Sequence, residues 1–228
     1  DTQDITLNDT DNKFNGAIDF DGAAVKISNT ESTKFDASSA DGNLEVISGG
    51  PIIQIGALDI TGTSSFTADD GNDKQGITLE HTGNKFTGAI DFDGGNVSIY
   101  NTLDTALAGG NAEGNLTIVS ALGISSNDQD ITAGGFIEIT AEDGNLTLGD
   151  GNTEGTVTAG GHISLEAKTG SSGNAHFIVV NSAVETTDET DGAISLNATG
   201  AITVNNSLDA ASYIVVQAKK NIDINDNL

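Results

Sequence analysis

Apolar and polar residues alternate with a period of two along most of this chain. Segments such as IEIT at 137–140, ISLEA at 163–167 and AITVNN at 201–206 place an apolar residue at every second position. This alternation is typical of a β-strand with one buried face. Because no stretch combines a 3.6-residue period with helix caps, we expect almost no helix.

The strand-like segments recur at a regular spacing. They start about every 20 residues, at Ile77, Val97, Leu116, Ile137, Val157 and Phe177. A second series relates Ile194 to Ile214 and Ile202 to Ile222. Gly-Asn pairs precede several starts, and both residues tolerate the backbone of tight corners. The spacing predicts an all-β solenoid with rungs of about 20 residues, in which apolar residues of successive rungs stack.

In addition to the 20-residue spacing, the sequence contains a longer repeat. The segment 5–30 recurs at 77–102, which is a 72-residue shift, and DGNLEVIS at 41–48 recurs as EGNLTIVS at 113–120. We therefore expect one elongated domain, 1–228, with a tandem duplication (about 1–72 and 73–144) and a diverged third part (145–228). Since 72 is not a multiple of 20, either the unit contains an irregular rung or the second copy is rotated about the axis.

Composition narrows the possible partners. The chain has 34 Asp and Glu against 8 Lys and Arg, a formal charge of −26, which repels nucleic acid phosphates and anionic lipid. Because of this charge, we do not expect nucleic acid binding. No run of 18 apolar residues occurs, so we do not expect membrane insertion. A hydrophobic share of 36% with 29 Gly excludes disorder by composition, and the lack of Cys excludes disulfides and thiolate metal sites.

The motif DFDG occurs once in each copy and is the strongest candidate metal site. Asp19 and Asp21 in the first copy, and Asp91 and Asp93 in the second, each place two carboxylates on one face of a strand. Two carboxylates with turn carbonyls could begin a calcium site. The alternative is a solvated outer face that ends in an Asp-Gly turn, because no complete calcium-loop motif is present.

Other candidate clusters are weaker. Two groups of oxygen ligands could also hold calcium: Asp69, Asp70 and Asp73 around Gly71, and Asp223, Asn225 and Asp226. The three histidines, His81, His162 and His176, are too few and too scattered to indicate a metal site. We therefore expect no cofactor, with calcium as the open alternative.

The longer strings resemble a known family. ITLEHTGNKFTGAIDFDGGNVSIYNT, GNLTLGDGNTEGTVTAGGHISLEAKTG and GAISLNATGAITVNN are similar to the exoproteins of two-partner secretion systems, the filamentous-haemagglutinin-type adhesins of Gram-negative bacteria. The resemblance covers nearly the whole chain and is a pattern of rungs, as in the repetitive shaft of these adhesins. It implies a single right-handed parallel β-helix, secretion through an outer-membrane transporter, and display on the bacterial cell surface. The N-terminal secretion domain of the family is not evident.

Some adhesins of this type carry sugars on Asn-x-Ser/Thr. This sequon occurs at Asn8, Asn96, Asn115, Asn145, Asn197 and Asn205. The alternative is chance, because the chain is rich in Asn, Thr and Ser.

The function we expect is that of a structural and adhesive segment of a large secreted exoprotein, which contacts a receptor or glycan on a host cell or a bacterium. We do not expect an enzyme. A polysaccharide lyase on this scaffold needs a cation beside its carboxylates, and the chain has no Arg and few Lys. A β-helical glycosidase, which needs only paired carboxylates, and a calcium-dependent surface or matrix protein are the alternatives.

Overall fold

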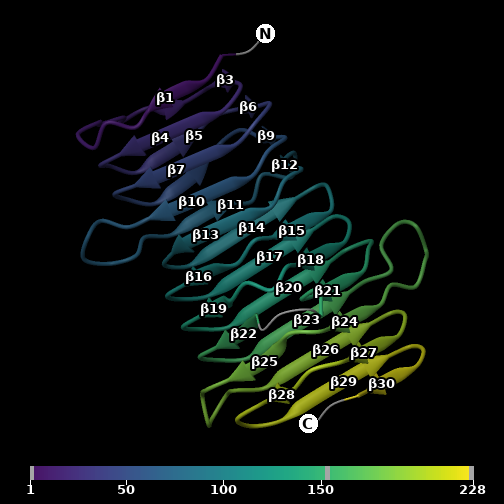
Figure 1. Cartoon of the computed structure of the whole chain (residues 1–228). Coiled ribbons are helices and arrows are strands. Elements are labelled where there is room, and N and C mark those ends of the chain that lie inside the picture. Colours follow the sequence, from purple (N-terminus) through teal and green to yellow (C-terminus); the bar gives the residue numbers. More distant parts are fainter. Residues whose placement is uncertain (1–2, 152–154, 226–228) are drawn as a thin grey trace.

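The computed structural model describes residues 3–151 and 155–225, and all regular secondary structure in those ranges is β-strand. Thirty strands, β1–β30, form three columns, and every turn of the chain adds one strand to each column (Figure 1). Neighbouring strands of a column pair in parallel, with one break in the third column that is described below. The expected all-β fold, a parallel β-helix, is confirmed.

Each column takes every third strand in chain order. The first column contains β1 (Ile5–Leu7), β4 (Val25–Asn29), β7 (Leu44–Ser48), β10 (Ser64–Ala68), β13 (Ile90–Gly94), β16 (Gly110–Ala112), β19 (Ile131–Ala133), β22 (Thr156–Ala159), β25 (Ala183–Thr186) and β28 (Leu208–Asp209). The second contains β2 (Ala17–Ile18), β5 (Thr33–Phe35), β8 (Ile52–Gln54), β11 (Ile77–Leu79), β14 (Val97–Asn101), β17 (Leu116–Ser120), β20 (Ile137–Ala141), β23 (Ile163–Ala167), β26 (Ile194–Ala198) and β29 (Ile214–Ala218). The third contains β3 (Asp21–Gly22), β6 (Ser38–Ala40), β9 (Leu58–Ile60), β12 (Lys85–Phe86), β15 (Thr105–Leu107), β18 (Ile124–Ser126), β21 (Leu146–Leu148), β24 (Ile178–Val180), β27 (Ile202–Val204) and β30 (Ile222–Ile224).

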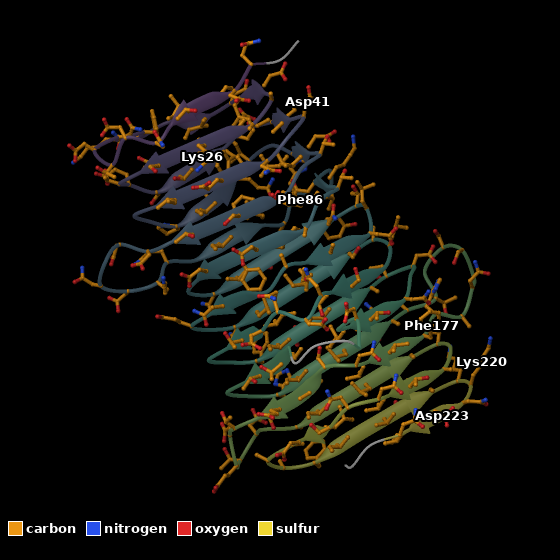
Figure 2. All side chains as sticks on the ribbon, in the orientation of Figure 1. Lys26, Asp41, Phe86, Phe177, Lys220 and Asp223 are labelled. Carbon is orange, nitrogen blue, oxygen red and sulfur yellow. The ribbon has the colours of Figure 1, made fainter. Side chains whose placement is uncertain are left out.

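The period-two pattern separates the inside of the stack from its outside. Apolar residues at alternate positions of a strand are buried, and the polar residues between them face solvent. Phe86 lies inside the stack, whereas Lys220 and Asp223 lie on its outside (Figure 2). A single rung leaves its apolar side uncovered, so the rungs above and below supply the core.

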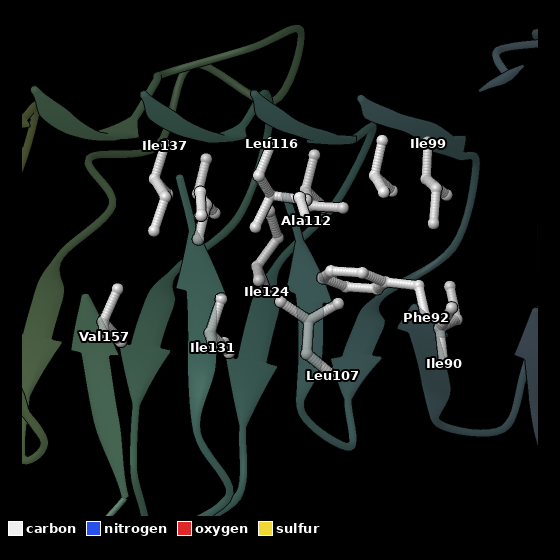
Figure 3. Packing of buried hydrophobic residues seen from close by; sticks show 14 of the residues in the cluster. Ile90, Phe92, Ile99, Leu107, Ala112, Leu116, Ile124, Ile131, Ile137 and Val157 are labelled. Carbon is white, nitrogen blue, oxygen red and sulfur yellow. The ribbon is translucent and has the colours of Figure 1, made fainter. Parts of the chain in front are cut away.

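The core consists of rows of aliphatic residues at the same register position. Val97 pairs with Leu116, and Leu116 pairs with Ile137, so these buried residues stack as the spacing predicts. The expected extension of this row to Val157 is wrong. Val157 is buried, but it stacks on Ile131 in the first column (Figure 3).

The departure has a simple cause, which is that rungs differ in length. The partner of Ile137 is Ile163, which lies beyond Val157 in the chain. A count of 20 residues from Ile137 therefore reaches Val157 in the first column, before the chain returns to the second. The predicted start at Phe177 is also wrong, because β24 begins at Ile178 and the Phe177 side chain is 41% exposed. The pairs Ile194 with Ile214 and Ile202 with Ile222 are as predicted.

The second copy of the 72-residue unit is rotated by one column. Ile5–Leu7 forms β1 in the first column, and its copy, Ile77–Leu79, forms β11 in the second. In the same way β4 corresponds to β14 and β7 to β17. The unit therefore contains ten strands, which make three turns and one further strand. Both explanations left open by the sequence apply, because the unit also contains an irregular rung: the turn from Ile52 to its partner Ile77 is longer than the regular spacing.

The third column is interrupted after β12, which pairs with β9, and β15 lies on β13 of the first column instead. Ile90 at the start of β13 pairs with Leu107 of β15, and Gly94 at its end pairs with Ala112 of β16. Two consecutive strands therefore lie along a single strand of the rung before them. The new corner between them contains Gly110, whose φ is 154°, and a Cβ there would lie 2.5 Å from the ring of Phe92. Only glycine fits at this corner.

Buried asparagines form hydrogen bonds that stabilise equivalent corners of both copies. Asn29 Nδ2 donates to the carbonyl of Phe14 (3.2 Å), and its Oδ1 accepts from the Phe14 N–H (2.9 Å). Asn101 makes the same pair of bonds to Phe86, at 3.0 and 2.9 Å. The amide is a donor and an acceptor at once, so one side chain satisfies both backbone groups of the chain that passes it.

Candidate functional sites

The DFDG carboxylates of the second copy lie on the outer side of β13. Asp91 and Asp93 face outward, whereas Phe92 between them is buried. Asp93 already has a cationic partner, because Lys74 Nζ donates to its Oδ2 at 2.6 Å. Asn111 Nδ2 donates to the other oxygen of Asp93 at 3.2 Å. A calcium ion at Asp93 would have to compete with the ammonium group of Lys74.

The first copy of the motif lies on a different face. Asp19 and Asp21 are exposed, and Ser39 Oγ donates to Asp21 Oδ1 at 3.0 Å. Asp21 belongs to the third column and Asp93 to the first, so the two pairs do not combine into one site. Within residues 3–151 and 155–225, no group of three His, Cys, Asp or Glu could hold a metal ion. Calcium binding by either pair stays a prediction.

The acidic loop between β10 and β11 uses its carboxylates to form its own turns. Asp69 Oδ1 accepts from the Gly71 N–H at 2.7 Å, and Asp70 Oδ1 accepts from the N–H of Asp73 at 2.9 Å. The hydrogen bond from Lys74 is the main cause that lowers the pKa of Asp69. For Asp70, the backbone hydrogen bond from Asp73 is the main cause of a lowered pKa. These carboxylates therefore act as turn caps.

The cluster expected at the C-terminal end is only partly described. Asp223 is exposed on β30, and Asn225 Nδ2 donates to Asn205 Oδ1 at 2.8 Å, whereas Asp226 lies outside the described residues. Asn205 Nδ2 in turn donates to Asn181 Oδ1 at 2.9 Å. Asn181, Asn205 and Asn225 thus form a ladder with one asparagine in each of three rungs.

The sequon asparagines have two structural roles. In three of them, Oδ1 accepts a backbone N–H from the next rung: Asn96 from Asn115, Asn115 from Phe136, and Asn145 from Phe177. Asn197 and Asn205 use Nδ2 as a donor, to Glu166 Oε1 and to Asn181 Oδ1. Asn8 is exposed. Glycosylation stays a prediction, and it would have to displace the Nδ2 bonds of Asn197 and Asn205.

One polar cluster was not foreseen from the sequence. Asp143 receives hydrogen bonds from the side chain and the N–H of Ser172 and from Ser171 Oγ, and its Oδ1 lies 3.0 Å from His176 Nε2. The Ser172 hydroxyl is the main cause that holds the pKa of Asp143 well below its ordinary 3.8, at about 2. All three partners lie in the next rung, far from Asp143 in sequence, so no local motif indicates the cluster.

The cluster contains aspartate, histidine and serine, but its geometry differs from that of a nucleophilic triad. His176 Nε2 faces both Asp143 Oδ1 (3.0 Å) and Ser172 Oγ (3.4 Å). A triad requires one ring nitrogen on the carboxylate and the other on the hydroxyl. Ser172 also donates its proton to Asp143 directly. The arrangement holds the β23–β24 loop against the preceding rung, and Phe177 is the last residue of this loop (Figure 2).

A second feature missed from the sequence is a row of corner residues before the second column. Phe136, His162, Ala193 and Tyr213 each precede a strand of that column, and the N–H that follows each of the first three donates to the carbonyl of the next. The Phe136 and His162 rings are stacked with centroids 5.2 Å apart. Two adjoining hollows lie along this row, with volumes of about 300 and about 330 Å³.

No helix in the described ranges has the length and apolar character needed to cross a membrane.

Comparison with known proteins gives one match. A family model described as "Repeats of unknown function (DUF5649)" matches residues 22–93. The matched stretch is as long as the shift between the two copies, and it runs from the end of β3 into β13. No curated protein and no solved structure matches the chain. Over about a third of its length, the chain is therefore similar to this family of repeats.

Proposed function

We propose that this repeat protein is a structural and adhesive segment of a secreted bacterial surface fibre. The observation that carries the proposal is the stack of ten rungs, whose core is made of continuous aliphatic rows. Each added rung lengthens such a stack without changing its cross-section. The resemblance to adhesins of two-partner secretion systems supports a position at the cell surface, with an outer-membrane transporter as the route.

The core of the stack is buried by packing between rungs. Ile27 in β4 and Ile202 in β27 are buried, and each has a paired strand on both sides. A stack built in this way forms progressively, because each rung is the template for the next.

The sides of the stack favour many weak contacts over one deep pocket. The hollows on them are open to solvent, and two of them have volumes of about 430 and about 330 Å³. We propose no catalytic role, since the Asp143 cluster lacks the geometry of a proton relay. Weak contacts gain strength when many copies are displayed on one surface.

The test compares one molecule with many. We expect the soluble chain to bind cells feebly and beads coated densely with it to adhere, because only the beads offer simultaneous contacts. Beads coated with the Leu116→Asp variant, which has almost the same composition but a disrupted core, are the control. Tight binding by the single chain, or turnover of a polysaccharide that a carboxylate substitution abolishes, would contradict the proposal.

A further inference from the structure

The row of corner residues contains a gap between two rings. His162 and Tyr213 occupy the same register position two rungs apart, and Ala193 lies between them. With strands about 4.8 Å apart, the backbones at these two rings are separated by about 10 Å. The small side chain of Ala193 is 8% exposed, whereas Tyr213 is 61% exposed. The hollow of about 300 Å³ lies here and is lined by both rings.

A ring-shaped ligand fits this gap. Placed halfway between His162 and Tyr213, it would lie about 5 Å from each, which is within the range of stacked rings. A flat group in van der Waals contact on both sides needs only about 7–8 Å, so a thicker, puckered ring fills the gap better. Next to it, the Phe136–His162 stack lines the second hollow, which shares His162 and Asp191 with the first.

The polar groups around the gap are mainly hydrogen-bond acceptors. Glu138 and Asp191 supply carboxylates, and Ser164 and Ser195 supply hydroxyls. Ionised carboxylates accept hydrogen bonds and repel anions. These groups therefore fit a ligand that carries several hydrogen-bond donors and no negative charge, as the hydroxyls of a neutral sugar do.

The wall that carries Asp191 is held in place. Thr186 Oγ1 donates to the Gly192 carbonyl at 2.8 Å, and the Gly192 N–H donates to the Asp188 carbonyl at 2.7 Å. Asp188 Oδ1 also accepts from the N–H and hydroxyl of Thr190. A wall fixed before binding loses less entropy when the ligand arrives.

We propose that this corner groove, defined by Phe136, His162, Ala193, Tyr213 and Asp191, binds a neutral glycan through one of its hexopyranose units, which lies between His162 and Tyr213. A pyranose has an apolar ring face for stacking and an edge of hydroxyls for the carboxylates. The hollow at Ala193 takes this unit, and the adjoining hollow beside Phe136 and His162 leaves room for a neighbouring part of the glycan. This inference deepens the proposed adhesive function, on which it rests, by naming a site and a ligand class.

The experiment measures binding by saturation-transfer NMR and by fluorescence, to which Tyr213 contributes as one of two tyrosines in a chain without Trp. The probes are cellohexaose, maltohexaose, mannohexaose and chitohexaose, with a heparin hexasaccharide and hexa-arginine for comparison. Ala193→Phe fills the gap and Tyr213→Ala removes one wall. Phe177→Ala, which removes an exposed ring from the β23–β24 loop, away from the groove, is the matched control. Circular dichroism checks that each variant is folded.

We expect at least one neutral hexasaccharide to bind with a millimolar Kd, to lose tenfold or more of its affinity in Ala193→Phe and in Tyr213→Ala, and to be unaffected by Phe177→Ala. The proposal is overturned if no neutral probe binds, if both groove variants bind normally, or if heparin or hexa-arginine is the probe that depends on the groove. Bead adhesion is measured in parallel. Adhesion that persists in Ala193→Phe would refute the groove as the contact and leave the fibre function intact.

Discussion

At the scale of single residues, the outer carboxylates have specific local partners. Asp143 accepts hydrogen bonds from two serines and a histidine, and Asp70 caps a turn of its own loop. Lys74 joins Asp69 to Asp93. Some of the carboxylates that give the chain its high charge therefore cap turns or hold loops in place, and each does so in its ionised form.

Acid should loosen the β23–β24 loop through Asp143. The folded pKa of Asp143, about 2, lies below its ordinary 3.8, so its contribution to stability is present above pH 4 and is lost as the pH falls towards 2. Asp143→Asn should flatten this part of the pH dependence of urea unfolding between pH 5 and pH 2. The same substitution at the exposed Asp209 should not. Equal acid dependence in both variants would show that the cluster does not stabilise the fold.

Calcium should act on the DFDG motif mainly as a general counterion. Lys74 already neutralises Asp93, so we expect millimolar calcium to raise the Tm no more than magnesium at matched ionic strength. A specific site would appear as an excess effect of calcium that Asp91→Asn with Asp93→Asn removes. Lys74→Gln, which removes the competing cation, is the variant in which such a site is easiest to detect.

At the scale of elements, the strands are defined by which side of each faces the core. In β17, Leu116 and Ile118 are buried and Thr117 between them is partly exposed. Parallel pairing continues this alternation through β20 and β23. The same substitution should therefore change the stability strongly at a buried position and little at the position next to it.

Leu116→Asp should cost several kcal/mol of folding free energy, because it buries an unpaired carboxylate within the core. Thr117→Asp adds the same charge on the outer side and should change the stability little. Thermal melts followed by circular dichroism at 218 nm compare the two variants. A Leu116→Asp variant with the same melting temperature as the wild type would disprove the register of the β14–β17–β20 row.

At the scale of the whole molecule, charge repulsion opposes the stack. The chain carries a net charge of −26, whereas exposed ion pairs such as Lys26–Glu45 contribute little. Carboxylates on neighbouring rungs, such as Glu185 and its register partner Asp209, lie well within the Debye length of dilute buffer. Folding concentrates this charge, so salt should favour the folded state.

We expect sodium chloride between about 10 mM and about 500 mM to raise the Tm by several degrees, because screening weakens repulsion more than it weakens the few attractive pairs. Differential scanning calorimetry at pH 7 measures the shift. Potassium glutamate at the same ionic strengths is the control for specific chloride binding. A Tm that falls with salt would mean that attractive pairs dominate.

The sequence by itself determined the strands, their alternation and the repeat. These are local properties: a period of two selects which side of a strand is buried, and Gly-Asn pairs indicate corners such as the one before Leu116. The rungs that keep the regular spacing, for example from Ile194 to Ile214, could be paired from the sequence because equal spacing returns the chain to the same column.

Only the tertiary structure decided which residues meet across rungs of unequal length. The rungs from Ile137 to Ile163 and from Ile163 to Ile194 are both longer than the regular spacing, so counting in equal steps misplaced Val157. The same uncertainty concealed the pairing of β13 with both β15 and β16, the contacts of Asp143 with its partners in the next rung, and the gap at Ala193. Each of these features depends on the number of residues in the corners between paired strands, and that number is matched to the packing between rungs.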